Sequence, residues 1–283
     1  MIDLPLTMLA AFVGVGLLVG ILSGMLGIGG GTILVPMFKL GFGMPALGAT
    51  ATSMFTIIPT SISGVISHVR GKTCVPRFGV AAGLGGAATS PVGVWLASLS
   101  PAWATMVAAA CVIAYSACTM LSKAFALWKS TRRDEADGST QTQGQTQGDG
   151  DDGLVPYAVP QGAKPVALAA LIGLVAGVLS GYVGVGGGFL IIPLFMQLLR
   201  MPMKLTSGTS LIAVLMLSVP GTVMQALLGN VQWLAGICVA VGAIPGAVIG
   251  TKLLARVPEL ALRFIFGAFL LVAAALLAFD QVS

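Results

Sequence analysis

Three consecutive glycines occur twice in this chain, in the segments GIGGGTILVP (Gly27–Pro36) and GVGGGFLIIP (Gly184–Pro193). Glycine permits a sharp turn and lets a ligand approach the backbone closely. A helix that starts after such a turn directs free N–H groups and a partial positive charge towards it, which favours an anion. We therefore expect an anionic substrate to bind at Gly29, Gly30, Gly31, Thr32, Gly186, Gly187, Gly188 and Phe189.

Serine and threonine cluster in two further segments, GATATSM (Gly48–Met54) and LTSGTSL (Leu205–Leu211). Their hydroxyl groups can donate hydrogen bonds to an oxyanion without a buried counter-charge. The alternative is a bond to a carbonyl of the residue's own helix, which is common for Ser and Thr. The first hypothesis adds four residues to the predicted substrate site: Thr52, Ser53, Thr209 and Ser210.

The ionisable residues argue against a carboxylate proton relay. Proton pumps keep a carboxylate inside a span, whereas all nine acids here lie near the chain ends, in a polar central segment or in a short turn: Asp3, Asp134, Glu135, Asp137, Asp149, Asp151, Asp152, Glu259 and Asp280. One histidine and four cysteines form no metal-ligand pattern, so we expect neither a metal nor a cofactor. His68 is the only side chain that titrates near neutral pH, and it is either a gate or proton site or an interfacial residue without a functional role.

The composition is that of a protein built from membrane helices. Residues are 57% hydrophobic and 8% charged, against about 25% charged residues in soluble domains. Apolar runs of about 20 residues recur, a length that crosses a bilayer, and they do not alternate as barrel strands would. Glycines four residues apart are typical of closely packed membrane helices, which predicts a packing role for Gly16, Gly20, Gly24, Gly173, Gly177, Gly181, Gly242, Gly246 and Gly250.

The chain contains two copies of one unit. Leu179–Phe195 repeats Leu22–Phe38 at an offset of 157 residues, and 12 of the 23 residues from Gly16 to Phe38 are identical at that offset. The segment between the copies is rich in Gly, Gln, Thr and Asp and cannot bury enough apolar surface to fold. We predict a first membrane repeat at 1–128, a disordered cytoplasmic linker at 129–164 and a second membrane repeat at 165–283.

The distribution of Lys and Arg predicts that the two copies are inverted. Inverted copies place 13 basic residues on one side and only Lys39 on the other, whereas copies of the same orientation place 8 and 6. Basic residues collect in cytoplasmic loops, so we predict a multi-pass protein of the plasma membrane (a bacterial inner membrane) with both termini outside. The Gly-rich segments are then broken helices that span or re-enter the membrane and meet near its midplane.

The doubled G-x-G-G-G-x-x-x-x-P element, followed each time by a Thr-Ser pair at the start of a helix, resembles the sulfite exporter TauE/SafE family of membrane anion transporters. The resemblance covers roughly residues 10–128 and 165–278. It implies export or uptake of small sulfur-containing anions such as sulfite and organosulfonates. The long polar linker departs from compact members, and the identity of the substrate does not carry over because the family is broad. The matching motif positions are Gly29, Gly30, Gly31, Pro36, Gly186, Gly187, Gly188 and Pro193, with Thr52, Ser53, Thr209 and Ser210 behind them.

We expect a secondary transporter that moves a small anion by alternating access around the two glycine segments, in a lipid bilayer and without a nucleic-acid partner. An anion channel or a substrate-free membrane assembly factor has the same sequence features and stays open as an alternative. A coupling ion, sodium or a proton, and a homo-oligomer also stay open. An enzyme is not expected: Ser63 and His68 are five residues apart on one helix and poorly placed to meet as a protease pair.

Overall fold

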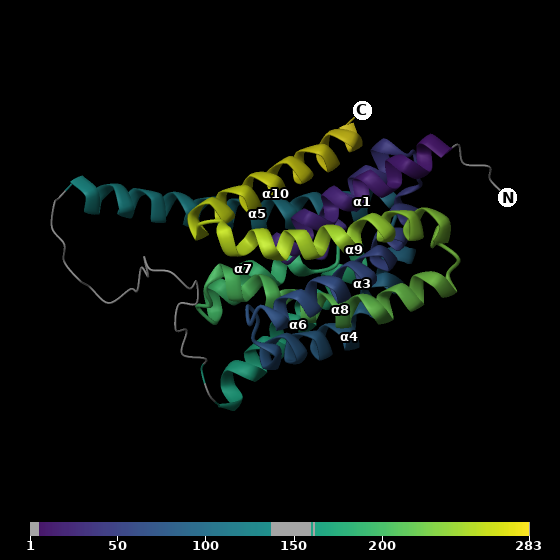
Figure 1. Ribbon diagram of the computed structural model, residues 1–283. Coiled ribbons are helices and arrows are strands. Elements are labelled where there is room, and N and C mark those ends of the chain that lie inside the picture. The colour runs from purple at the N-terminus through teal and green to yellow at the C-terminus, as the bar shows by residue number, and fades with distance from the viewer. Residues whose placement is uncertain (1–5, 137–159, 161, 283) are drawn as a thin grey trace.

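A computed structural model describes residues 6–136, 160 and 162–282, and every element in this part of the chain is helical (Figure 1). Long apolar runs favour helices, because a helix satisfies its backbone hydrogen bonds internally and needs no water to do so. The elements are α1 (Leu6–Leu26), α2 (Gly31–Pro36), the π-helix η1 (Met37–Gly41), α3 (Ala46–Arg70), α4 (Pro76–Leu99), α5 (Ala102–Ala136), α6 (Ala163–Val183), α7 (Gly188–Leu198), α8 (Met203–Leu227), α9 (Trp233–Arg256) and α10 (Glu259–Val282).

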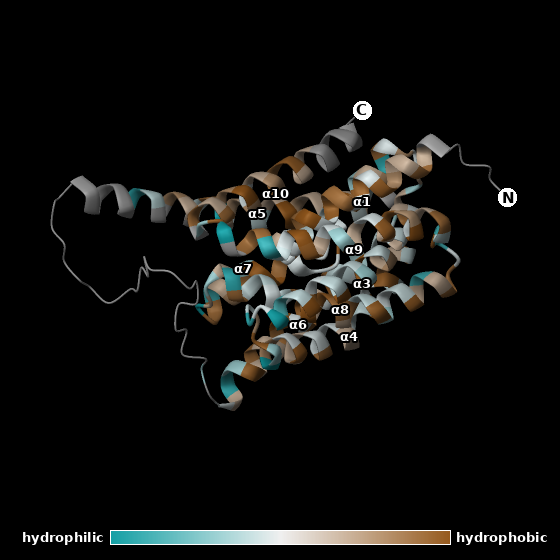
Figure 2. Ribbon diagram, viewed as in Figure 1, coloured by the Kyte–Doolittle hydropathy of each residue, from teal (hydrophilic) through white to brown (hydrophobic). Residues whose placement is uncertain are grey.

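Seven of the described helices are long and apolar enough to cross a membrane: α1, α3, α4, α5, α6, α8 and α9. Apolar residues line the outer faces of the bundle, as Figure 2 shows. Large apolar side chains stay exposed there, among them Leu18 at 64% and Leu84 at 60%. Such a surface suits hydrocarbon rather than water. The prediction of an all-α, polytopic membrane protein is confirmed.

Two helix pairs, α1 with α9 and α4 with α6, pack with their backbones in near contact. A Cβ atom built at Gly20 would lie 2.3 Å from the carbonyl oxygen of Ala243, and one built at Gly173 would lie 1.9 Å from that of Ala82. The contacts advance in the same direction along both helices of a pair, so the paired helices run parallel. The predicted packing role of the glycines four residues apart is confirmed.

At the centre of the bundle α3 and α8 run antiparallel. His68 near the end of α3 lies against Gly208 near the start of α8. Met54, in the first half of α3, lies against Gly221 in the second half of α8. Each central helix also runs parallel to one neighbour, α3 to α9 and α8 to α4.

The helices α5 and α10 form a layer along one side of the bundle, drawn at the top of Figure 1. The rings of Phe125 and Phe264 meet edge to face with their centroids 5.3 Å apart, and Leu121 packs against Gly267. These contacts show that α5 and α10 run antiparallel.

The helix bounds of the second half repeat those of the first at the offset of 157 residues, so that α6, α8 and α9 correspond to α1, α3 and α4. The fourth helices are exchanged between the halves: α4 packs on α6 and α8, and α9 packs on α1 and α3. The two halves are therefore interlocked and bury a common core.

Helix extends into both ends of the predicted linker. α5 continues to Ala136 and α6 begins at Ala163, whereas the predicted linker covers 129–164. The residues after Trp128 include Lys, Arg, Glu and Ala, which are good helix formers and prolong a helix that packing has already started. Residues 137–159 and 161 lie outside the described part of the chain, so disorder there stays a prediction.

Candidate functional site

The first glycine segment forms the tip of a hairpin inside the bundle. After α1 ends at Leu26, α2 and η1 turn back along it. Two ring contacts fix this course: the centroid of Phe42 lies 4.1 Å from that of Phe12 in the first half of α1, and the centroid of Phe38 lies 6.3 Å from it. The first glycine segment therefore turns the chain back along α1, as both courses compatible with the sequence require.

Both glycine loops depend on left-handed backbone. An L-residue with a side chain costs about 1–2 kcal/mol in this conformation, whereas glycine adopts it freely. The φ angles are 78°, 76° and 87° at Gly27, Gly29 and Gly30, and 75°, 85° and 69° at Gly184, Gly186 and Gly187.

The two loops meet each other at the middle of the central helices. A Cβ atom built at Gly31 would lie 2.4 Å from the carbonyl oxygen of Val185 in the other loop. Ile57 and Val214, which lie midway along the 25-residue helices α3 and α8, pack against glycines of both loops. All twelve residues of the predicted substrate site are buried: Gly29, Gly30, Gly31, Thr32, Thr52, Ser53, Gly186, Gly187, Gly188, Phe189, Thr209 and Ser210.

Two of the predicted hydroxyl ligands already bind the glycine loop of the opposite half. Ser53 donates to the carbonyl oxygen of Gly184 at 2.6 Å, and Ser210 donates to that of Gly27 at 2.7 Å. Each Ser hydroxyl thus fixes a loop carbonyl that no helix satisfies. The two bonds cross between the halves in equivalent positions.

The other two predicted hydroxyl ligands hold the turns that precede α4 and α9. Thr52 accepts a hydrogen bond from the N–H of Gln232 at 3.0 Å, and Thr209 accepts one from the N–H of Val75 at 2.9 Å. The four hydroxyls therefore contribute to the packing of the two halves in this conformation.

Sequence reasoning missed a different set of hydroxyls, those of Ser23, Ser61, Ser180 and Ser218. All four are fully buried, and none has a hydrogen-bond partner. A built Cβ at Gly29 would lie 3.5 Å from Ser61 Oγ, and one at Gly30 would lie 3.8 Å from Ser23 Oγ. The sequence did contain a signal for these residues: at the offset of 157 residues Ser23 matches Ser180, and Ser61 matches Ser218.

His68 connects three segments at one end of the bundle. It is 1% exposed, its Nε2 lies 3.0 Å from the carbonyl oxygen of Gly24, and its Nδ1 lies 2.7 Å from Thr73 Oγ1. Because a carbonyl only accepts, the neutral ring with a proton on Nε2 satisfies both contacts.

The residues equivalent to His68 and Thr73 in the second half form a similar pair: Asn230 donates to Gln225 Oε1 at 2.8 Å. Ser63 is not brought to His68, since it donates to the carbonyl oxygen of Ile244 on α9.

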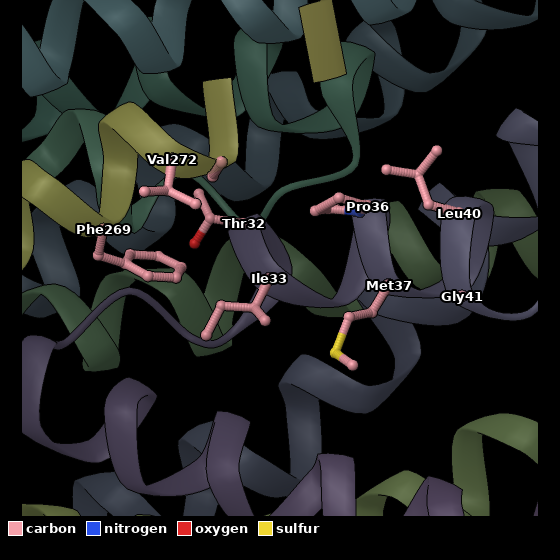
Figure 3. Close-up of a pocket in the computed structure, with 9 residues that line it drawn as sticks. Thr32, Ile33, Pro36, Met37, Leu40, Gly41, Phe269 and Val272 are labelled. Atoms are coloured by element: carbon pink, nitrogen blue, oxygen red, sulfur yellow. The ribbon is translucent and has the colours of Figure 1, made fainter. Parts of the chain in front are cut away.

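A cavity of about 230 Å³ lies between α2, η1 and α10 (Figure 3). Thr32 contributes a buried, unpartnered hydroxyl, and side chains such as Met37, Phe269 and Val272 make the rest of the lining apolar. Phe189 takes the place of Thr32 in the second half and is fully buried. Thr32 is the only hydroxyl-bearing residue of the lining, so this cavity offers an anion a single side-chain donor.

Comparison with known proteins agrees with the membrane architecture. Residues 12–277 match the family model described as "Sulfite exporter TauE/SafE". The chain is 27% identical over 246 residues to "Probable membrane transporter protein YdhB" of Bacillus subtilis (strain 168), covering 87% of this chain and 90% of the relative. It is 27% identical over 248 residues to "Probable membrane transporter protein YunE" of the same organism, covering 84% of each chain. No solved structure matches significantly.

Proposed function

Because this chain belongs to the sulfite exporter TauE/SafE family and is a membrane transporter, we propose that it moves small sulfur-containing anions, such as sulfite or organosulfonates, by alternating access around its two glycine loops. The observation that carries the proposal is the meeting of the loops at the middle of α3 and α8. Irregular backbone at that depth is tolerated only where protein buries it or where it lines a polar cavity. Broken helices at a midplane are the usual site of substrate in secondary transporters.

We infer that the two halves are inverted structural repeats. In support, α3 and α8 occupy equivalent positions in the repeat and run antiparallel, and so do α5 and α10. Inversion gives two equivalent arrangements of the same halves, one open to each side, which is the basis of alternating access. In the present conformation the loops pack together and Ile57 and Val214 lie against both, so a substrate can reach them only after the loops part.

The basic residues support an orientation with both termini outside a plasma membrane. All Lys and Arg residues except Lys39 belong to helix ends, to turns or to the part of α5 after its apolar segment Trp103–Ser122. These parts gather at the end of the bundle where α3 finishes and α8 starts. Basic residues mark the cytoplasmic side. We place the linker there, together with His68, which would act as a gate because it joins α1 to the turn after α3.

The orientation is testable at two equivalent exposed turns. Lys72 and Gly229 are repeat mates, with φ angles of 54° and 72°. In a background without native cysteines, a membrane-impermeant maleimide should label K72C only from the inside and G229C only from the outside. Labelling of both variants from the same side would contradict inverted repeats.

Transport itself is tested by counterflow in proteoliposomes. Labelled sulfite should accumulate transiently against unlabelled sulfite or an alkyl sulfonate, with saturation. Flux that never saturates would favour the alternative, an anion channel. No flux with any oxyanion, with or without sodium or a proton gradient, would favour a substrate-free assembly factor.

A further inference from the structure

The buried hydroxyls of Ser23, Ser61, Ser180 and Ser218, here called the free serines, donate to no protein group. Ser23, Ser61 and Ser180 lie beside glycines of the loops, and Ser218 is the repeat mate of Ser61. We propose that they are the substrate's hydrogen-bond donors and that the site, having no counter-charge, selects monovalent oxyanions over divalent ones. This inference rests on the proposed transport of anions and adds the residues and the charge class of the substrate.

The free serines of the first loop approach the same two glycines from two helices. Ser23 lies on α1 beside Gly30, and Ser61 lies on α3 beside Gly29. In this conformation Val214 Cγ1 and Val19 Cγ1 occupy the space beside Gly29 and Gly30, so an oxygen atom of a ligand can reach these hydroxyls only once the loops part. In the part of the chain that the structure describes, the N–H groups of Gly29 and Gly30 make no backbone hydrogen bond and add two donors.

The second loop carries the equivalent set. A Cβ atom built at Gly187 would lie 3.2 Å from Cβ of Ser180, and Ser218 is the repeat mate of Ser61. The N–H groups of Gly186 and Gly187 likewise make no backbone hydrogen bond among the described residues. Each half of the protein therefore supplies an equivalent set of donors, as expected if the two halves are inverted repeats that share one substrate site.

The free serines differ from the other hydroxyls of the same helix. Thr56 and Thr60 on α3 each donate to the carbonyl oxygen four residues earlier, which is the usual behaviour of a hydroxyl in a membrane helix. Ser61, the next residue, does not. A buried hydroxyl without a partner costs about 1–3 kcal/mol, so four of them at repeated positions call for a ligand that accepts their hydrogen bonds.

The charge class follows from what surrounds the loops. On the helices that pack against them, the described Lys, Arg and His side chains lie at or near helix ends and not at the loops: Lys39, His68, Arg70, Arg77, Lys164, Lys204, Lys252, Arg256 and Arg263. Without a positively charged side chain at the loops, hydroxyl and N–H dipoles alone must replace the hydration shell of the bound anion. The cost of burying an ion rises with the square of its charge, so a dianion costs about four times as much as a monoanion.

The first test replaces the free serines by alanine. Each hydroxyl that binds an anion contributes about tenfold in affinity, so S23A, S61A, S180A and S218A should each weaken binding of sulfite and methanesulfonate by about that factor. Thermal stability should be unchanged or higher, because no protein hydrogen bond is lost. S53A is the matched control: it removes a partnered hydroxyl and should lower stability. Unchanged affinity in the variant with all four serines replaced, despite saturable transport by the unmodified protein, would overturn the inference and leave the proposed function standing.

The second test separates the two charge states of one substrate. Sulfite passes from monoanion to dianion near neutral pH, whereas methanesulfonate stays monovalent. Apparent affinity for total sulfite should rise as pH falls from about 8 to about 6, with no change for methanesulfonate. The contrast should persist in H68Q, which removes the only histidine of the chain. Equal pH trends for both anions, or tight competition by sulfate, would refute monoanion selection.

Discussion

Replacement of Gly20 by alanine should destabilise the protein, whereas the same replacement of Gly14 on the same helix should not. A Cβ atom at Gly20 would lie 2.3 Å from the carbonyl oxygen of Ala243, while ordinary van der Waals contact begins at 3.4 Å. α1 and α9 would have to separate by roughly 1 Å at this point to relieve the overlap. Gly14 has no such neighbour within 4 Å and faces outwards.

The expected magnitude is a difference of about 2 kcal/mol between the two variants. Overpacking of this kind costs about 1–3 kcal/mol, and the better helix propensity of alanine returns up to about 1 kcal/mol in both variants. G20A should therefore be destabilised by about 1–2 kcal/mol, while G14A should be unchanged or slightly more stable. Unfolding in mixed micelles of mild detergent and SDS measures both free energies. If G20A matches G14A within about 0.5 kcal/mol, the helices do not pack through their backbones as described.

Three further predictions concern the loops and the turn after α3. S53A and S210A should each lose about 1–2 kcal/mol of stability, because each leaves a buried loop carbonyl without its donor. Equal melting temperatures of the variants and the parent protein would contradict a stabilising role for these two hydrogen bonds. G29A should be destabilised by strain at a φ of 76° and by a Cβ atom 2.6 Å from Val214 Cγ1, and V214A should restore part of the loss in a double-mutant cycle; strictly additive effects would argue against the contact. Burial raises the pKa of the Cys74 thiol, so less thiolate is present at neutral pH and its alkylation by a maleimide should be slow and rise steeply towards alkaline pH; a rate at neutral pH equal to that of the denatured chain would refute this.

Much of the architecture could be predicted from local features of the sequence. The length and composition of apolar runs depend only on neighbouring residues, so the class of membrane protein follows from them. Identity at an offset of 157 residues revealed the duplication. The helix bounds correspond at the same offset because similar sequences have similar helix propensity and place their helix breakers at matching positions. The glycine loops were found for the same reason, since three adjacent glycines interrupt a helix in any context.

Hydrogen-bond partners could not be predicted in this way. Ser53 and Ser210 look like ligands in the sequence, but their acceptors lie 131 and 183 residues away in the opposite half. Ser23 and Ser61 look ordinary, and only the packed structure shows that neither reaches an acceptor. A hydroxyl can turn towards its own helix or across an interface, and the choice depends on which carbonyl the fold brings near.

The sequence by itself therefore determined a duplicated helical membrane protein with two glycine loops, because these properties depend on composition, spacing and repetition. The tertiary structure decided that the first loop turns back beside α1, that α4 and α9 change places between the halves, and that the two loops meet. It also decided which hydroxyls hold the fold and which remain free. These outcomes depend on contacts between residues far apart in the chain, where the shape of one half sets the partners of the other.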